Sequence, residues 1–163
     1  MEEKYRKRMT EALGYKRQDK SLQTWRKVKS VRSILKNYLI MVICRYLPDI
    51  ELKNRIYRKT GMRIGRNVSI YASNLDILFP ELIEIGDNTV IGNTTAILTH
   101  EFLSHGSRKG RVKIGKDVTI GIMTIILPGV EIGDGAVVSA YSLVNKSVEP
   151  GAFVGGVPIK RIR

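Results

Sequence analysis

The segment IGKDVTIGIMTIILPGVEIGDGAVVSAYSLVNKSVE, residues 114–149, repeats with a period of six residues. The same pattern occurs upstream in IGDNTV and IGNTTA, residues 85–96, and in IGRNVS, residues 64–69. A register that holds through six consecutive units indicates a structural repeat rather than chance. The first positions are Ile114, Ile120, Ile126, Ile132, Val138 and Val144, and the small or β-branched fifth positions are Val118, Thr124, Val130, Ala136, Ser142 and Val148.

This period predicts a stack of short strands. Each hexapeptide supplies a strand and a turn, with the aliphatic first residue inward and Gly, Asn or Asp relaxing the backbone at the corner. Three units make a triangular coil of ~18 residues, and parallel pairing between coils buries a continuous core. An alternating β–α sheet needs helices of about 10–15 residues between strands, for which there is no room. We therefore expect a mainly β fold, a parallel β-helix over residues 64–163.

The repeat fails in AILTHEFLSHGSRKGRVKIG, residues 96–115, where the protein's two histidines, His100 and His105, are found. The break predicts a loop, residues 101–113, that leaves the stack. Packing of the core does not require such a loop, and it is able to cover a cleft. His100 closes the strand that precedes the loop, whereas His105 lies deeper in it and is expected at the surface.

Charge divides the chain into two parts. Residues 1–63 hold 18 Lys/Arg against 6 Asp/Glu, whereas residues 64–163 hold 10 against 9. The single cysteine, Cys44, excludes an intramolecular disulfide, and together with a polar N-terminus it favours the cytoplasm. The apolar run YLIMVIC, residues 38–44, is too short to cross a bilayer, which takes about 20 residues.

Residues 1–63 read as a basic helical segment. Residues 1–20 are polar and are expected to be frayed or loosely helical. Apolar residues at three- and four-residue steps predict a helix over 21–47 that Pro48 stops. Asp49 can cap a second, short helix that ends just before Gly61.

Three roles remain open for this basic segment. The helices can cap one end of the β-helix, or lie in the plane of a membrane with Lys and Arg beside apolar residues. Nucleic-acid binding is less favoured, because the segment has no recognised motif and few aromatic residues for stacking on bases.

The chain from Ile64 onward resembles the hexapeptide-repeat acyltransferases. The resemblance is most specific in ILPGVEIGDGAVVSAYSLVNKSVEPGAFVGGVPIKRIR, residues 126–163, and is closest to the sugar O-acetyltransferases of the maltose and galactoside type. It implies a left-handed parallel β-helix, a homotrimer with active sites between subunits, and acetyl-CoA as the acyl donor. No metal cofactor is expected.

The resemblance also implies a role for His100, which matches the family's catalytic histidine. The imidazole would take the proton from the acceptor hydroxyl as that oxygen attacks the thioester carbonyl. Its other ring nitrogen should donate to a carbonyl or carboxylate that fixes the tautomer. The backbone near Gly121 is the candidate donor to the negative charge that develops on the thioester oxygen.

Matching motifs place the CoA along the last coils. The candidates are Ala140, Asn145 and Lys146 along its length, and Lys160 and Arg163 at its phosphates. The chain departs from the family pattern at Ile122, Asn145 and Ile159, so details of the CoA path are expected to differ.

The candidate acceptor ligands are Asn74, Asp76 and Glu81, in the coil before His100. Pro80 occupies the position closest to the family's acceptor-binding Asp, which argues against a maltose-type acceptor. A hydrophobic or lipid-linked sugar remains open, as does transfer to the amine of an amino sugar.

The sequence also bears on two other classes of function. A zinc carbonic anhydrase with this fold needs three histidines at each zinc, and the chain has two. A non-catalytic scaffold, with the basic N-terminal end as its functional part, predicts that no acyl-CoA binds.

Overall fold

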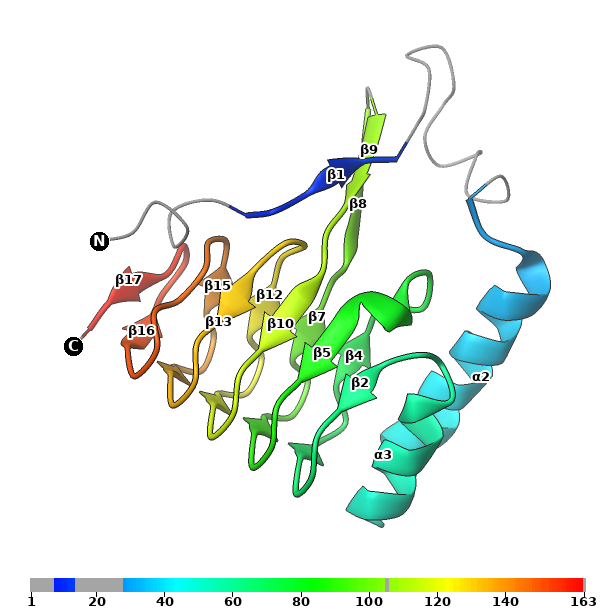
Figure 1. Ribbon diagram of the computed structural model, residues 1–163, viewed down its shortest axis with the longest axis horizontal. Helices are drawn as coiled ribbons and strands as arrows, with labels where there is room; N and C mark the ends of the chain where they lie inside the picture. The colour runs from blue at the N-terminus through cyan, green and yellow to red at the C-terminus, as the bar shows by residue number, and fades with distance from the viewer. Residues whose placement is uncertain (1–7, 14–27, 105, 163) are drawn as a thin grey trace.

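The computed structural model describes residues 8–13, 28–104 and 106–162. Figure 1 shows a prism of stacked coils, with helices α2 (Val31–Tyr46) and α3 (Ile50–Arg58) at one end and the C-terminus at the other. A two-stranded arm projects from the side of the prism. The prediction of a mainly β, parallel β-helix with an N-terminal helical segment is confirmed.

Three parallel sheets form the sides of the prism. The first sheet contains β2 (Arg63–Ile64), β5 (Ile83–Ile85), β10 (Val112–Ile114) and β13 (Glu131–Ile132). The second contains β3 (Ser69–Ile70), β6 (Val90–Ile91), β11 (Thr119–Ile120), β14 (Val137–Val138) and β16 (Phe153–Gly155), and β17 (Lys160–Arg161) adds to it antiparallel. The third contains β4 (Asn74–Leu75), β7 (Ala96–Ile97), β12 (Ile125–Ile126) and β15 (Leu143–Val144).

The first residue of each hexapeptide fills the core, as the pattern predicts. Ile85, Ile114 and Ile132 pair in register along the first sheet and are at most 2% exposed. The polar fifth positions are buried as well, because their hydroxyls reach carbonyls of the next coil. Thr89 Oγ1 donates to Gly115 O at 2.8 Å, and Thr95 Oγ1 donates to Gly121 O at 3.2 Å.

Asparagine and aspartate hold one corner of the prism. Asn67, Asn88 and Asp117 all have positive φ angles, between 54° and 57°. Their side chains form a ladder, in which Asn67 Nδ2 donates to Asn88 Oδ1 and Asn88 Nδ2 donates to Asp117 Oδ1, each at 3.1 Å. Short polar side chains therefore support a backbone conformation that costs most residues energy.

The N-terminal helices differ from the prediction at one boundary. A continuous helix over 21–47 is wrong at Ser30, which is extended (ψ 141°) and caps α2 by accepting from Ser33 N. Residues 21–27 lie outside the described residues. Helix α3 is confirmed, with Asp49 Oδ1 accepting from Leu52 N at 2.7 Å and Gly61 beyond its end at φ +96°.

Both helices pack against the first coil through polar anchors. Asn54 Nδ2 donates to Val68 O at 2.7 Å, Lys53 Nζ to Ile70 O at 3.1 Å, and Asn37 Nδ2 to Ile77 O at 2.9 Å. These bonds satisfy carbonyls that the open end of a β-stack would leave unpaired. The helices thus cap the prism, and among the described residues no helix is long and apolar enough to span a membrane.

The excursion from the stack is a β-hairpin rather than the loop expected at 101–113. Strand β8 (His100–Leu103) pairs antiparallel with β9 (Gly106–Lys109), and Gly110 N donates to Thr99 O at its base. Val112 and Lys113 already belong to β10. Pairing the two strands satisfies backbone groups that an open loop would leave to solvent.

An N-terminal strap, residues 8–13, crosses this hairpin. Its strand β1 (Glu11–Ala12) pairs antiparallel with β9, so the expectation of a loose helix is wrong for these residues (Figure 1). Met9 N donates to Gly129 O at 2.8 Å, and Arg8 Nη1 bonds Glu101 Oε2 at 3.1 Å. A Cβ atom at Gly129 would lie 2.4 Å from Met9 O, so the strap fits only because this residue is glycine.

We predict that Gly129→Ala displaces the strap from the hairpin. The added methyl group collides with the Met9 backbone, and the φ of +78° adds strain. Amide hydrogen exchange should accelerate at Met9 and Leu13, the two strap residues whose N–H groups donate to Gly129 and Ser107.

Gly135→Ala is the matched control, because Gly135 has φ +67° with open space around the Cβ position. It should lower the melting temperature while leaving exchange at the strap unchanged. Equal strap exchange in the two variants would contradict the prediction.

Candidate functional site

His100 and Asp76 form a close pair at the base of the hairpin. His100 Nδ1 lies 2.5 Å from Asp76 Oδ2, with the histidine side chain 18% exposed and the aspartate side chain fully buried. Asp76 directly follows β4, and His100 begins β8 in the next coil. Stacking of the coils therefore brings together two residues that are 24 positions apart.

The Asp76 carboxylate is held by backbone donors. Oδ1 accepts from Leu78 N at 2.8 Å and Phe79 N at 3.1 Å, which forms a tight Asx turn, and Oδ2 accepts from Thr99 N at 2.9 Å. Burial by itself would raise the pKa of Asp76. The hydrogen bond and charge of His100 and the bonds from Thr99 and Phe79 outweigh that effect and hold its pKa below the ordinary value.

This carboxylate fixes the tautomer of His100. An ionised carboxylate only accepts hydrogen bonds, so Nδ1 carries the proton and donates it to Asp76. The second ring nitrogen, Nε2, is then the basic one in neutral imidazole. His100 is thus a partly exposed proton acceptor, and the buried carboxylate of Asp76 fixes the orientation of its ring.

Aromatic rings flank the imidazole. The centroid of Phe102 lies 5.0 Å from that of His100, and the centroid of Phe79 lies 5.9 Å away, both edge-to-face. Lys109 Nζ lies 5.6 Å from the Phe79 centroid, and Lys29 Nζ lies 5.2 Å from it. The histidine therefore sits among apolar edges with cations close by.

One face of the hairpin gathers polar and apolar groups beside His100. In the antiparallel register His100 pairs with Lys109, and Phe102 pairs with Ser107, which places all four side chains on one face. Ser107 is 7% exposed, and no described residue hydrogen-bonds its hydroxyl. The sequence analysis did not identify Phe102, Ser107 and Lys109 as site residues, because strand pairing within the expected loop was not foreseen. It also missed Phe79, which lies in the preceding coil and comes near His100 only through the stacking of the coils.

The predicted acceptor ligands are not brought together. Asp76 is buried beneath His100, with both oxygens engaged, so direct contact with an acceptor disagrees with its environment. Asn74 accepts from Arg45 Nη1 of α2 at 2.8 Å. Glu81 lies in the short helix η3 (Pro80–Leu82), is 41% exposed and pairs with Lys29 at 2.5 Å.

The Gly121 N–H is committed elsewhere. It donates to Val138 O at 2.8 Å as part of the inter-coil ladder. A Cβ atom at Gly121 would lie 2.3 Å from Ala140 N, so this glycine permits close stacking of two coils. The Gly121 N–H itself is therefore not available to an oxyanion, and a donor elsewhere in the backbone near Gly121 stays a prediction.

The predicted CoA residues lie on the outer surface of the last coils. Ala140, Lys146 and Lys160 are exposed, and Asn145 is half-buried. No described residue hydrogen-bonds the buried Oδ1 of Asn145. Arg163 and His105 lie outside the described residues.

The side chain of Ile159 does not lie on the surface of the last coils, where the CoA is expected. Its side chain is 2% exposed and belongs to the hydrophobic core, and its N–H donates to Leu143 O at 3.0 Å. The bulk points into the prism because β17 folds back on β16. Ile122, by contrast, is 47% exposed.

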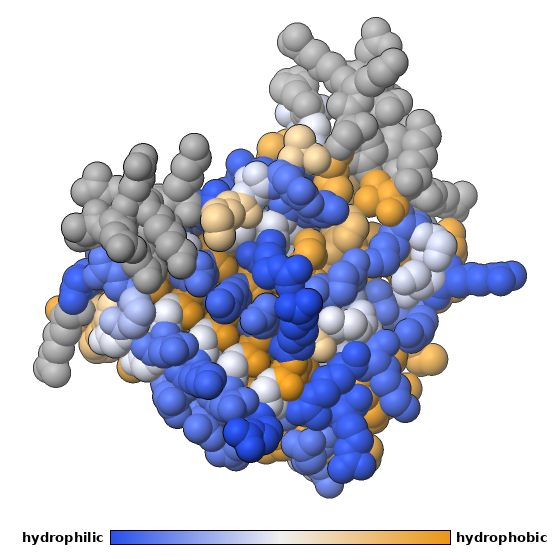
Figure 2. Space-filling view, in the orientation of Figure 1, coloured by the Kyte–Doolittle hydropathy of each residue, from blue (hydrophilic) through white to orange (hydrophobic). Residues whose placement is uncertain are grey.

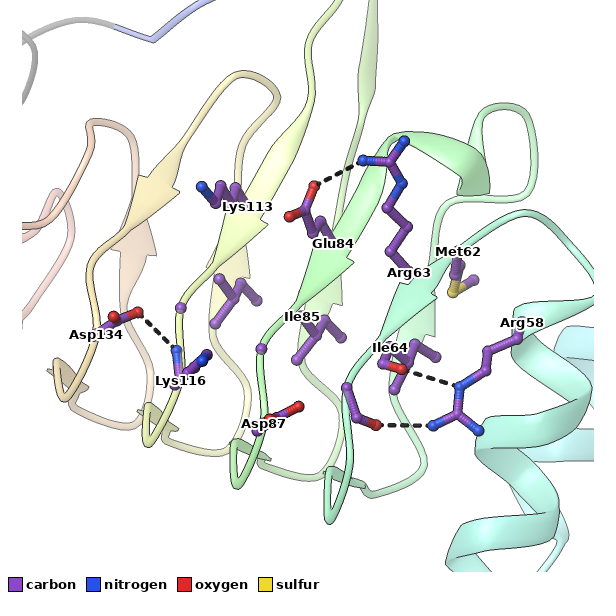
Figure 3. A pocket seen from close by; sticks show the side chains of 14 residues that line it. Arg58, Met62, Arg63, Ile64, Glu84, Ile85, Asp87, Lys113, Lys116 and Asp134 are labelled. Atoms are coloured by element: carbon purple, nitrogen blue, oxygen red, sulfur yellow. Dashed lines mark hydrogen bonds and ion pairs between the residues drawn. The ribbon is translucent and has the colours of Figure 1, made fainter.

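A wide hollow of about 650 Å³ lies on the outer face of the first sheet, away from the sequence-predicted residues. Figure 3 shows Arg63 directed toward Glu84 and Asp134 bonded to the backbone of Lys116. Hydrophilic side chains cover much of this side of the molecule (Figure 2). Neither His100 nor Asp76 is among the described residues that line the hollow, so it is not the predicted site.

The described residues contain no metal-binding cluster. Nowhere within 8–13, 28–104 and 106–162 do three His, Cys, Asp or Glu side chains gather in a way that could hold an ion. His100 is engaged by a carboxylate instead.

Comparisons with known proteins agree with this fold. The family model for the bacterial transferase hexapeptide (six repeats) matches residues 111–146. The Bacillus subtilis (strain 168) protein named "Putative acetyltransferase YvoF" is 51% identical over 131 residues, which is 79% of this chain and 76% of that protein. Galactoside O-acetyltransferase of Escherichia coli (strain K12) is 38% identical over 112 residues, 64% of this chain and 54% of that enzyme.

A solved structure has the same architecture. The hexapeptide-repeat acetyltransferase VCA0836 of Vibrio cholerae O1 biovar eltor, complexed with acetyl coenzyme A, superposes with a TM-score of 0.65 at 21% identity over 89% of this chain and 98% of that chain. The repeat, the coil geometry and the relative that is half identical lead to one conclusion, which confirms the resemblance found in the sequence: the chain belongs to the hexapeptide-repeat acetyltransferase family, and it is an acyltransferase.

Proposed function

We propose that this acyltransferase moves an acetyl group from acetyl-CoA to a sugar hydroxyl, with Nε2 of His100 as the general base. The observation that carries the proposal is the contact of 2.5 Å between His100 Nδ1 and the buried carboxylate of Asp76. This contact orients His100 as a proton acceptor at the base of the β8–β9 hairpin, and packing of the core does not require that hairpin.

The protonation states follow from the geometry. His100 receives the proton of the acceptor hydroxyl at Nε2 as that oxygen attacks, which makes the oxygen a better nucleophile. The imidazolium formed in that step keeps its Nδ1–H bond to Asp76. As the carbon–sulfur bond of the thioester breaks, Nε2 gives its proton to the departing sulfur, so that CoA leaves as the free thiol and His100 is neutral again. Because the Asp76 pKa is held low, the carboxylate stays ionised and stabilises the added positive charge.

The last coils fit the donor. Acetyl-CoA would supply the acetyl group as a reactive thioester. Lys146 and Lys160 are exposed cations suited to its phosphates, and the half-buried Asn145 is the neighbour of Lys146 on the same coil.

The acceptor side favours a sugar. Phe79 and Phe102 offer apolar edges, while Ser107 and Lys109 offer a hydroxyl and a cation on the same face of the hairpin as His100. A sugar ring presents apolar C–H faces and hydroxyl rims in the same way. Of the three predicted acceptor ligands, Asn74 and Glu81 are accessible, and one of the relatives is named a galactoside O-acetyltransferase.

We predict that the protein binds acetyl-CoA and releases CoA when a sugar acceptor is present, and that His100→Ala abolishes most of this release. Loss of a general base costs about 10²–10⁴-fold. Calorimetry measures donor binding, and thiol release measures turnover across a panel of sugars, amino sugars and lipid-linked sugars.

Arg66→Ala, at a side chain that is 91% exposed, should keep wild-type turnover. Donor binding without transfer to any hydroxyl, but with transfer to amines, would replace O-transfer by N-transfer. Failure to bind any acyl-CoA would leave the prism as a scaffold.

We predict that Asp76→Asn lowers kcat by about 10²–10⁴-fold, by analogy with other histidine–carboxylate pairs, while leaving donor affinity unchanged. The variant should also alter the pH dependence of stability. A carboxyl whose pKa is lower in the folded state stabilises the protein above its unfolded value of about 3.8, and this contribution is lost as pH falls through the folded pKa. The stability gap between wild type and Asp76→Asn should therefore narrow in acid.

Asp134→Asn is the matched control, since Asp134 also accepts a backbone N–H, that of Lys116 at 2.9 Å, but has no histidine neighbour in the described bonds. Its kcat should stay at the wild-type value. An unchanged kcat in Asp76→Asn would remove the orienting role from Asp76.

We also propose a cytoplasmic homotrimer. Ile122, Met123, Ile125 and Tyr141 are 42–62% exposed on successive coils of the prism, more apolar surface than scattered residues explain. Light scattering should give a mass three times the 18.4 kDa chain, and Ile125→Lys should lower it. A monomeric wild type would contradict this proposal.

A further inference from the structure

Helix α2 presents its apolar residues outward. Asn37 and Cys44 are buried against the first coil, whereas Leu35 is 61% exposed and Leu39 is 58% exposed. At 100° per residue the outward arc carries seven exposed apolar side chains, a continuous stripe rather than scattered residues. They are Val31, Leu35, Tyr38, Leu39, Val42, Ile43 and Tyr46, and no described residue covers them.

Polar anchors on the inner side keep the helix in this orientation. Asn37 Nδ2 donates to Ile77 O at 2.9 Å, and Arg45 Nη1 donates to Asn74 Oδ1 at 2.8 Å. Rolling the helix to bury Leu35 and Leu39 would break these bonds and would leave the partly buried Ile77 carbonyl without its donor. The exposed stripe is therefore a stable feature of the fold.

Basic residues border the stripe. Arg32 and Lys36 are exposed next to it, and α2 contains no acidic residue. Residues 1–63 as a whole hold 18 Lys/Arg against 6 Asp/Glu. A partner that covers the outward face of α2 therefore needs apolar groups to contact the stripe and negative charges to contact the basic residues beside it.

A second copy of the chain meets that requirement poorly. Helix α2 carries Arg32, Lys36 and Arg45 but no carboxylate, so symmetric contact between two α2 stripes would bring only basic side chains of the two helices together, and like charges repel. An anionic bilayer meets it well, because its headgroups attract Lys and Arg while its acyl region accepts Leu, Val and Ile. Tyr38 and Tyr46 suit the boundary between these two regions.

We propose that α2 docks in the plane of an anionic membrane, with its outward stripe at the headgroup–acyl boundary. The contact is peripheral, because the 16-residue helix lies along the surface. It also lies near the candidate site, since Asn37 holds the segment that follows Asp76 and Lys29, just before α2, lies 5.2 Å from the Phe79 ring centroid. The arrangement brings His100 close to the lipid surface without requiring acyl transfer for binding.

Vesicle flotation of the full-length protein tests this proposal. Vesicles of phosphatidylcholine with added phosphatidylglycerol should carry the protein at low salt, and pure phosphatidylcholine should carry far less. The variant Leu35→Ser/Leu39→Ser should bind about tenfold more weakly or worse, because it removes apolar contact. Arg32→Glu/Lys36→Glu should lose the preference for anionic vesicles.

Leu52→Ser on α3 is the matched control, because it makes the same exchange at a leucine that is 42% exposed outside the stripe. It should bind as the wild type does, and circular dichroism should report all variants as folded. Wild-type protein that stays in the aqueous fraction with anionic vesicles at low salt would overturn the proposal. A lower oligomer mass in Leu35→Ser/Leu39→Ser, with no vesicle binding by the wild type, would assign the stripe to contact between copies.

Discussion

The stacking of one coil directly on the next determines everything else in this molecule. Backbone N–H groups of each coil donate to carbonyls of the following coil, as in Val90 to Val118 and Ile125 to Ser142, and aliphatic side chains stack beneath them. The distance between neighbouring coils is the same along the stack and leaves no room for a larger residue where two backbones come close. A side chain at Gly121 would collide with the backbone of Ala140 for this reason. An excursion is tolerated only if the chain returns in register, and Val112 does so by pairing with Ile83.

The candidate site is a product of this stacking. Asp76 N donates to Ile97 O, which places its carboxylate directly under the start of β8, and Thr99 N and His100 Nδ1 both converge on Oδ2. The hairpin then adds residues from both of its strands around the imidazole. The base and the residue that orients it thus belong to consecutive coils, whereas the flanking groups belong to the arm.

The sequence predicts the parts of the molecule that depend on repetition or local signals. The six-residue register identifies the coils because every unit repeats the same constraint, and Asp49 marks the start of α3 because capping is local. The sequence does not reveal that the strap, residues 8–13, pairs with β9. A stretch of six mixed polar and apolar residues contains no pattern that identifies a strand about 100 residues away as its partner. The sequence likewise predicts Asp76 as an acceptor ligand, because its position beside His100 fits two roles equally well: contact with the acceptor or contact with the histidine ring. Only the stacked structure shows that the carboxylate is buried and faces His100 Nδ1.

The strap has a consequence for the order in which the protein is made. Arg8 and Glu101 are separated by 93 residues, so the strap leaves the ribosome long before its binding surface exists. At about 5–20 residues per second, synthesis of the intervening chain takes several seconds. The strap therefore makes its full set of contacts, the bond from Met9 N to Gly129 O included, only after the coil containing Gly129 has been added. Completion of the arm is in this way tied to vectorial synthesis, and a chain that stops short of that coil carries the histidine on an unfinished support.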